Sequence, residues 1–353
     1  MQFMRGRLDR PFAVASQRED RAPYRSTGLT VAHRILTLDR EAEDVSDAIF
    51  KRLDMTLEAV RATVRPGQPS TQAEALETLG RIEATITSLN FVCSIPAFLV
   101  GSFTEGLTTR PLDPRVIYAP ENTLRRPHVL AHQTDDFSHL DCDLGSLLYL
   151  AIGETLDLPL RMAEVPGHNF IRVVLRNDSQ MNWDTNYGFS KYTDTDYADR
   201  HGVTPDLIVN GTYLRSFSPE NVDGYFHFVR GLTFQAKSDL ARAIAEYKSA
   251  ILHFPQSPAS RNNIAWLYAS RRAAQNIVDR DEALQLSTRA VEIHRTGNAL
   301  DTLACVCAEQ GDFESATRYE TEAYNMTYNP SYRRMVEAFK SRQTYLDVNP
   351  EAP

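Results

Sequence analysis

The C-terminal part of the chain repeats one spacing of small residues three times, and this repetition constrains the fold more than any other feature. In the first and third copies, a small residue is followed by an alanine 12 positions later and by another 7 positions after that. In the middle copy the first interval is 18, which indicates an insertion of about six residues within 271–280. The residues concerned are Gly231, Ala243 and Ala250, then Ala265, Ala283 and Ala290, and finally Ala304, Ala316 and Ala323. Small residues at such spacing are typical of paired helices in close contact, so we predict helix pairs beyond residue 222.

Aromatic residues and prolines extend this pattern. They are Phe234, Tyr247, Pro255, Tyr268 and Pro330. Together with the small residues, they resemble the tetratricopeptide repeat, a unit of two helices. The resemblance implies an all-α solenoid of about three helix pairs over residues 223–345, closed by a polar capping helix over 331–345. Solenoids of this kind present concave surfaces to peptides, so the resemblance also implies a protein or peptide partner in the groove.

Residues 28–212 predict a separate domain upstream of the repeats. Apolar residues at three- and four-residue spacing predict one helix over 38–64 and a second over 71–90, which continues into the apolar segment 91–100. Residues 101–130 hold several prolines and no clean period, and therefore predict an extended excursion across the surface.

The later part of this domain changes from a helical period to a strand period. Residues 142–154, CDLGSLLYLAIGE, predict a helix that ends at Asp157-Leu-Pro159. Alternation then predicts three strands, over residues 159–165, 168–175 and 180–187, with Asn177-Asp178 in the turn between the last two. One helix followed by a short antiparallel meander indicates the α+β class.

Length and charge exclude several classes of protein. The chain has 353 residues, enough for two domains, and a net charge of −8, which argues against a general nucleic-acid binder. No segment approaches the ~18 apolar residues of a membrane span, and residues 1–27 predict a flexible tail without a signal peptide. We therefore expect a cytoplasmic protein with no membrane partner, although export without a cleavable signal stays open.

The four cysteines are too scattered for a disulfide framework. Cys305 and Cys307 lie two positions apart in a predicted helix and point to different faces, so we expect them in the core. Cys93, in the apolar stretch FVCSIPAFLV, is also expected in the core. Cys142 is the cysteine that these arguments leave for chemistry.

Cys142, His168 and Asp184 occur in an order that suits nucleophilic catalysis. Cys142 begins a predicted helix, whose free N–H groups and positive dipole end favour a thiolate. His168 opens a predicted strand behind Gly167, and an imidazole there can accept the thiol proton and return it to a leaving group. Asp184 lies on the next strand, where a carboxylate can hold the imidazole in one tautomer.

The hairpin between the two strands allows a geometric check. A three-residue loop centred on Asn177 would pair Asp184 with Phe170, on the same face as His168 and diagonal to it. Diagonal neighbours lie roughly 7–8 Å apart at Cα, within reach of a hydrogen bond between the two side chains. A two-residue loop would defeat the pair, because a shift of one residue moves a side chain to the opposite face.

The stretches DCDLGSLLYLAIGETLDLPLRMAEV, PGHNFIRV and NWDTNYG resemble the core of the transglutaminase-like superfamily, whose fold is related to papain. PGHNFIRV further resembles bacterial proteins that join such a core to tetratricopeptide repeats. The resemblance implies that Cys142 is the nucleophile, His168 the general base and acid, and Asp184 the orienting carboxylate. It implies no cofactor.

This chemistry predicts a thiol enzyme that acts on an amide or acyl bond of a protein or peptide. Attack by Cys142 would give a thioester, which water resolves in a protease, amidase or deamidase and an amine resolves in a transglutaminase. Trp183 and Tyr187 are candidates for lining the substrate cleft, with core packing the alternative for Trp183. An acyltransferase would use the same residues with a thioester donor.

Two alternatives stay open. Asp141 and Asp143 flank the cysteine and oppose thiolate formation, which favours a catalytically silent adaptor whose repeats bind a partner. A metal site is the second alternative, because a run of residues rich in possible ligands precedes the helix, against the simpler interpretation of a solvated acidic loop. These residues are His132, Asp135, Asp136 and His139.

Overall fold

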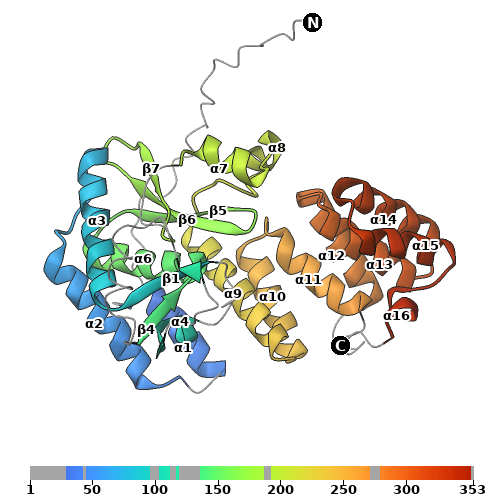
Figure 1. Ribbon diagram of the computed structural model, residues 1–353, viewed down its shortest axis with the longest axis horizontal. Coiled ribbons are helices and arrows are strands. Elements are labelled where there is room, and N and C mark those ends of the chain that lie inside the picture. Colours follow the sequence, from blue (N-terminus) through green and yellow to red (C-terminus); the bar gives the residue numbers. More distant parts are fainter. Residues whose placement is uncertain are drawn as a thin grey trace, which may run out of the picture.

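A computed structural model of the chain describes residues 29–42, 45–95, 103–111, 117–118, 136–186, 192–270 and 279–350, and the predicted tail at 1–27 lies outside them. The described residues form an α+β part followed by a run of paired helices that extends away from it (Figure 1). The α+β class and the helical C-terminal part are therefore confirmed.

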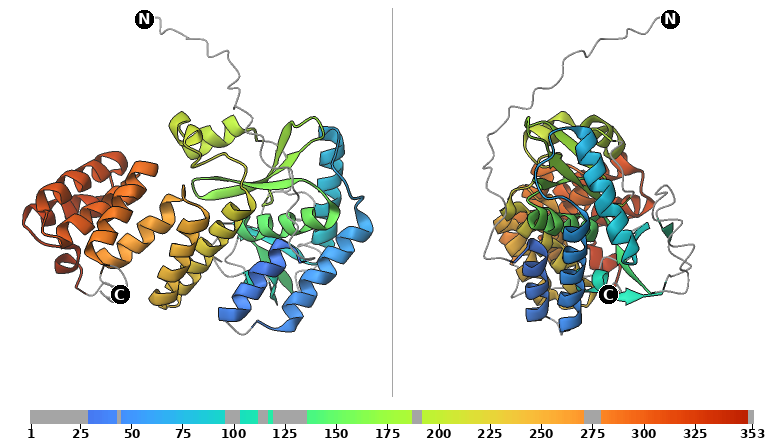
Figure 2. Two further views of the ribbon diagram at one scale, coloured as in Figure 1. Left: turned by 180° about the vertical axis from the view of Figure 1, so that it is seen from behind. Right: turned by 90° about the vertical axis from the view of Figure 1, so that its left-hand side faces the viewer.

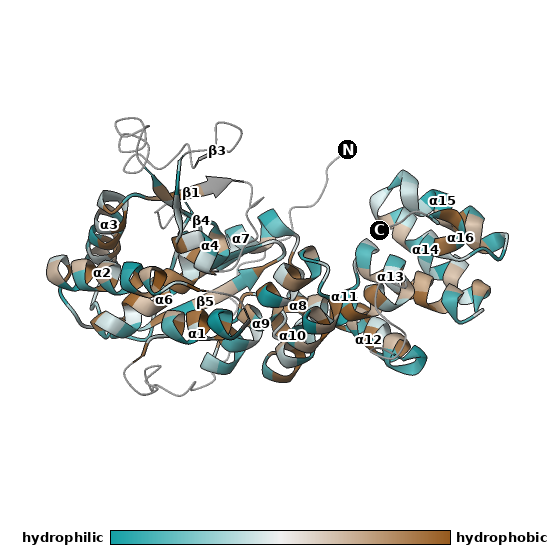
Figure 3. Ribbon diagram, turned by 90° about the horizontal axis from the view of Figure 1, so that it is seen from below, coloured by the Kyte–Doolittle hydropathy of each residue, from teal (hydrophilic) through white to brown (hydrophobic). Residues whose placement is uncertain are grey.

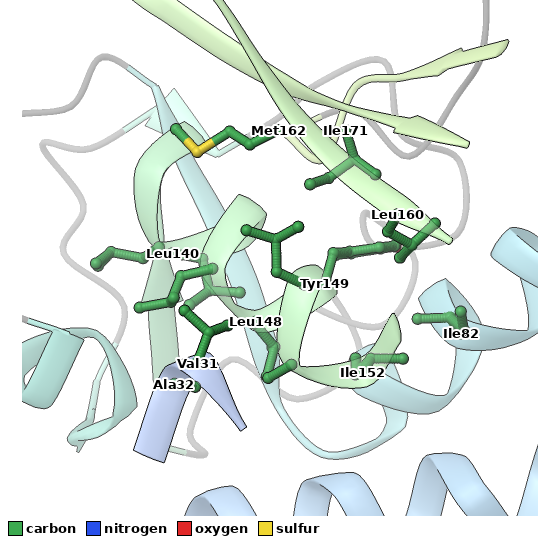
Figure 4. Packing of buried hydrophobic residues seen from close by; sticks show 14 of the residues in the cluster. Val31, Ala32, Ile82, Leu140, Leu148, Tyr149, Ile152, Leu160, Met162 and Ile171 are labelled. Carbon is green, nitrogen blue, oxygen red and sulfur yellow. The ribbon is translucent and has the colours of Figure 1, made fainter. Parts of the chain in front are cut away.

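Three helices begin the α+β part, which are α1 (Val31–Ala42), α2 (Asp47–Thr63) and α3 (Gln72–Ser88). The prediction of one helix over 38–64 was wrong, because Ser46 starts a new helix by accepting a hydrogen bond from the backbone N–H of Ala48. The spacing of apolar residues did not reveal the break, since both helices bury an apolar face in the same core. Figure 4 shows Val31, Ala32 and Ile82 of these helices in that core.

The apolar segment after α3 forms a strand, so its prediction as a continued helix was also wrong. Strand β1 (Phe91–Ile95) lies in a mixed sheet of order β2-β4-β1-β3, parallel to β4 and antiparallel to β3. The other members are β2 (Thr109–Arg110), β3 (Ile117–Tyr118) and β4 (Phe137–Leu140). Phe91, Val92 and Cys93 are all buried. A strand buried on both faces gives a continuous apolar run, which periodicity does not distinguish from a helix.

Residues 101–130 are only partly covered by the described ranges. Helix α4 (Phe103–Leu107) and strands β2 and β3 fall within them, so the described portion is not one extended excursion. Phe103 and Leu107 are buried in the main core, which explains why this portion packs on the domain.

The central helix and the meander agree with the sequence prediction. Helix α6 (Cys142–Leu156) precedes an antiparallel sheet of order β5-β6-β7, formed by β5 (Leu160–Val165), β6 (His168–Val174) and β7 (Gln180–Trp183). Asp157 ends α6 in the left-handed conformation, with φ 53°. Leu148, Tyr149 and Ile152 of α6 pack toward the sheet and the N-terminal helices (Figure 4).

Two short helices that the sequence did not predict cover the other face of this sheet. They are α7 (Asp194–His201) and α8 (Pro205–Val209). Tyr197 and Leu207 pack with Ala163, Val165 and Phe170 in a second, smaller core. The three-stranded sheet therefore lies between α6 on one face and α7 with α8 on the other (Figure 1).

The C-terminal helices form successive antiparallel pairs that extend the molecule along its longest axis (Figure 2). Their bounds are α9 (Pro219–Ala236), α10 (Leu240–His253), α11 (Pro258–Ala269), α12 (Arg280–Ile293), α13 (Gly297–Glu309), α14 (Phe313–Thr327), α15 (Pro330–Lys340) and α16 (Tyr345–Val348). Helix α11 ends at Ala269 and α12 begins at Arg280, whereas α9 and α10 are separated by residues 237–239 and α13 and α14 by residues 310–312. Most of the predicted insertion lies outside the described residues.

The repeated small residues lie where the helices of a pair touch. Ala243, Ala283 and Ala316 are fully buried, and a Cβ on Gly231 would sit only 2.4 Å from the Tyr247 ring. Hydrophobic and hydrophilic residues alternate along the ribbons of these helices (Figure 3), and the buried hydrophobic residues of the pairs form one core. The predicted capping helix at 331–345 corresponds to α15 followed by α16.

Helix α9 belongs to both parts of the molecule. Val222, Phe226 and Val229 lie in the core of the α+β part, whereas Phe234 lies in the core of the paired helices.

No helix within the described ranges is long and apolar enough to cross a membrane.

Candidate functional site

Cys142 is the first residue of α6, as predicted, and the residue is less buried than the other three cysteines. The buried Asp141 caps the helix by accepting a hydrogen bond of 2.9 Å from the Leu144 N–H. Cys93, Cys305 and Cys307 are buried, in agreement with their predicted place in the core. Cys142 is therefore the accessible thiol of the four.

Contacts along the first turns of α6 bring this helix to the residues that follow His168 and Asp184. The Ser146 hydroxyl donates to Asn169 Oδ1 at 2.7 Å, and the Asn169 side-chain amide donates to Asp143, the residue after Cys142. Gly145 lies against Thr185, since a Cβ at position 145 would be 2.9 Å from the threonine hydroxyl oxygen. Helix α6 therefore contacts Asn169 and Thr185, which directly follow His168 and Asp184 in the chain.

His168 and Asp184 are joined directly. His168 Nε2 lies 2.9 Å from Asp184 Oδ2, and the side chains are 13% and 3% exposed. The pairs Ile171–Trp183 and Val174–Gln180 confirm the predicted register, because the next position toward the strand end sets Phe170 opposite Asp184. Asp178 adopts the left-handed conformation that a three-residue hairpin loop requires, with φ 64°.

Asp184 has two further hydrogen-bond donors, which were not predicted from the sequence. The Tyr197 hydroxyl donates to Oδ2 at 3.1 Å, and the backbone N–H of Asn186 donates to Oδ1 at 3.0 Å. His201 stacks on His168 with a ring separation of 5.8 Å. Both Tyr197 and His201 come from α7, and the capping box that Thr193 and Asp196 form at its start was the signal available in the sequence.

A second set of contacts surrounds the thiol. The Cys142 thiol donates to Asp143 Oδ1 at 3.5 Å, and the Tyr225 hydroxyl of α9 donates to the same oxygen at 2.6 Å. The Asn169 side-chain amide donates to Asp143 Oδ1 as well. Burial, followed by the charges of Asp143 and Asp141, raises the pKa of the Cys142 thiol well above its usual value. Burial and the neighbouring Asp143 raise the pKa of Asp141 to about 7.

The side chains of His168 and Asn169 point to opposite faces of the sheet, as alternation along a strand requires. Asn169 contacts α6, whereas His168 contacts Asp184 and the α7 residues Tyr197 and His201. Within the described part of the chain, no hydrogen bond joins Cys142 to His168, and none reaches His168 Nδ1.

The remaining predicted site residues have other placements. Trp183 is 3% exposed and belongs to the main core, which supports its core alternative over a place in a cleft. Tyr187 lies outside the described residues. His139 is buried in β4, with Nε2 3.3 Å from the carbonyl oxygen of Arg110, so this nitrogen already has a partner.

The segment considered for a metal site is partly described. His132 and Asp135 lie outside the described residues, Asp136 is exposed, and His139 lies in a strand rather than a helix. Among the residues that the structure covers, no three histidine, cysteine, aspartate or glutamate side chains form a group that could hold a metal ion.

Comparisons with known proteins give no further assignment. No model of a known protein family matches the chain, and a search of curated proteins found no significant match.

Proposed function

We propose that this protein is a thiol-dependent enzyme of the transglutaminase-like, papain-related class, which acts on an amide or acyl bond of a protein or peptide. The observation that carries the proposal is the hydrogen bond between His168 Nε2 and Asp184 Oδ2, next to a helix that begins at the accessible Cys142. The N-terminal turns of that helix contact Asn169 and Thr185, which directly follow His168 and Asp184.

The hydrogen bond between His168 and Asp184 determines which ring nitrogen of His168 can accept the thiol proton. A carboxylate oxygen only accepts, so Nε2 carries the proton and the lone pair of the neutral ring is on Nδ1. In the proposed reaction, Nδ1 takes the Cys142 proton as the sulfur attacks a carbonyl carbon. The imidazolium then gives that proton to the leaving amine as the C–N bond breaks, and a thioester remains.

The thioester is resolved by an incoming nucleophile. Water, deprotonated by Nδ1, attacks the acyl carbon, and the thiolate leaves and regains its proton from the ring. This hydrolytic course makes the protein a protease, amidase or deamidase, and an amine in place of water makes it a transglutaminase.

The helical part is proposed to be a tetratricopeptide array that recruits the protein or peptide substrate. Fully buried alanines at the contacts between paired helices, including Ala243, Ala283 and Ala316, support this assignment. Helix α9 supports a direct connection to the site, because its Tyr225 donates to Asp143 beside the thiol.

A second candidate function is a catalytically silent adaptor in which the repeats alone act. The raised pKa of the Cys142 thiol favours this candidate, because a protonated thiol is a weak nucleophile. In the adaptor, the contact of the thiol with Asp143 is a permanent structural bond.

Selective alkylation tests the enzymatic proposal. Iodoacetamide should label Cys142 before the three buried cysteines of the folded protein, and His168→Ala should suppress this labelling roughly 100-fold, in the range of a lost general base. His201→Ala, which removes the second imidazole, is the matched control and should have a smaller effect. Equal labelling of Cys142 in the parent and in His168→Ala would favour the adaptor.

A further inference from the structure

We propose that Tyr197 of α7 is a positioning residue of the candidate site, which holds Asp184 and, by sharing its Oδ2 oxygen, sets the strength of the bond between Asp184 and His168. The catalytic consequence rests on the proposed function, whereas the hydrogen-bond arrangement is testable without any turnover.

The first support is the geometry of the shared oxygen. Asp184 Oδ2 accepts from His168 Nε2 at 2.9 Å and from the Tyr197 hydroxyl at 3.1 Å. Oδ1 accepts from the Asn186 N–H at 3.0 Å. Three donors from three different places in the chain therefore hold a carboxylate that is almost fully buried. A carboxylate fixed in this way keeps the imidazole in one orientation.

The second support is that the Tyr197 ring has little freedom to move. It stacks on Phe170 with centroids 4.0 Å apart and planes within 1°, and it is 2% exposed. Tyr192 packs against it edge-on at 5.6 Å. Phe170 is two residues along β6 from His168, so the same strand that carries the imidazole also fixes the phenol.

The third support is that the phenol stays a donor over the accessible pH range. Burial, and then the charge of Asp184, raise the pKa of Tyr197 well above its usual value. A buried hydroxyl that donates to a charged group forms one of the stronger hydrogen bonds in proteins. Its loss therefore has a measurable effect on the carboxylate.

His201 completes this side of the site. It lies one helical turn after Tyr197 and stacks on His168, with its own Nδ1–H donating to the Pro166 carbonyl oxygen at 3.0 Å. Helix α7 thus supplies both the hydroxyl that holds Asp184 and a ring that packs against the imidazole.

The physical consequence has a definite sign. Two donors on one oxygen compete for its electron density, so removal of the Tyr197 hydroxyl strengthens the remaining bond from His168 Nε2. A stronger bond moves the His168 Nε2–H proton resonance downfield. A more acidic phenol at position 197 donates a stronger hydrogen bond to Asp184 Oδ2. The bond from His168 Nε2 is then weaker, and the same resonance moves upfield.

Three variants of the full-length protein test the proposal by NMR, with the resonance assigned through its loss in His168→Gln. In Tyr197→Phe the His168 Nε2–H signal should move downfield. In Tyr192→Phe, which removes a hydroxyl from the neighbouring ring, the signal should stay in place. Site-specific 3-fluorotyrosine at position 197 keeps the hydroxyl and should move the signal upfield, which covers the case in which Tyr197→Phe does not fold.

An unchanged signal in folded Tyr197→Phe and with fluorotyrosine, or an equal shift in Tyr192→Phe, would overturn the proposal. If acyl transfer is also detected, Tyr197→Phe should slow acylation of Cys142 by about tenfold, as expected for one hydrogen bond to a charged group. If no variant or parent shows acyl transfer, the enzymatic proposal fails, while the NMR result still decides the role of Tyr197.

Discussion

Gly145 of α6 lies so close to Thr185 that a Cβ on the glycine would be 2.9 Å from the threonine hydroxyl oxygen. Thr185 directly follows Asp184, and Gly145 lies one turn after Cys142 in the same helix. This contact therefore sets how closely the helix that begins at Cys142 approaches the end of β7, which Asp184 directly follows.

Substitution of this glycine should separate the two elements. Gly145→Ala is expected to destabilise the protein by about 1–3 kcal/mol, because the added methyl group forces α6 away from Thr185. Gly80→Ala, in α3 with nothing within 4 Å of its Cβ position, is the control and should be neutral or stabilising by up to ~1 kcal/mol. Urea denaturation measures both, and equal stability of the two variants would contradict the close contact.

Asp143 is expected to keep the Cys142 thiol protonated. Its charge raises the pKa of Cys142, second in effect only to burial and ahead of Asp141. Asp143→Asn should therefore lower the pKa of the thiol and increase the rate of alkylation at pH 8, where more thiolate is then present.

Asp141→Asn is the matched comparison for this prediction, since asparagine caps a helix as well as aspartate does. It should shift the pH profile of alkylation in the same direction but by less. Mass spectrometry of the Cys142 peptide over a pH series gives both profiles. A larger effect of Asp141→Asn would show that the contact with Asp143 does not control the thiol.

A buried pair of carboxyl groups should make the helical part sensitive to alkaline pH. Burial raises the pKa of Glu320 to about 9 and that of Asp301 to about 6, from ordinary values of 4.5 and 3.8. Both folded-state values lie above the unfolded ones, so the folded state binds more protons. The contribution of these two groups to the free energy of unfolding is therefore fully present at acid pH, and it is lost as the pH rises from about 4 to about 9.

Glu320→Gln should remove most of this pH dependence and raise stability at pH 9 by roughly 2 kcal/mol or more relative to the parent. Glu322→Gln, on the same helix but in an exposed ion pair with Arg295, should change stability by less than about 1 kcal/mol. Thermal melts at pH 5 and pH 9 compare the three proteins. A parent protein that is equally stable at both values would rule out the buried pair as a titrating element.

Helix pairing in the C-terminal part depends on Gly231. A Cβ there would be 2.4 Å from the Tyr247 ring, so the methyl group of Gly231→Ala forces α9 away from α10. We expect this change to destabilise the protein by about 1–3 kcal/mol. Gly311→Ala, at a left-handed turn with φ 83° but with nothing within 4 Å, separates backbone strain from crowding and should cost about 1 kcal/mol. Combining Gly231→Ala with Tyr247→Leu should recover part of the loss, and no recovery would contradict crowding as its cause.

The sequence predicted the central features of the site because local signals agreed there. The helix at Cys142, the meander and the pairing of His168 with Asp184 followed from apolar periodicity and from the turn at Asn177-Asp178. Each of these depends on short-range spacing, which a single sequence contains.

Other features depend on contacts that only the folded chain makes. The apolar run at Phe91 became a strand because β4, 47 residues later in the chain, pairs with it in parallel and sets Val92 opposite His139. The Tyr197 hydroxyl can donate to Asp184 only because α7 folds back over the sheet. The Tyr225 hydroxyl similarly reaches Asp143 only because α9 packs into the α+β core.

Formation of a covalent acyl group on Cys142 would show that this thiol is a nucleophile and that His168 activates it. The full-length protein is mixed with an activated ester such as p-nitrophenyl acetate, and the burst of p-nitrophenol and the mass of the Cys142 peptide are followed together. We predict a burst equivalent to one acyl group per chain on Cys142, which is lost in Cys142→Ala and whose rate falls roughly 100-fold in His168→Gln. Acylation that proceeds at the same rate in the parent protein and in His168→Gln would contradict it.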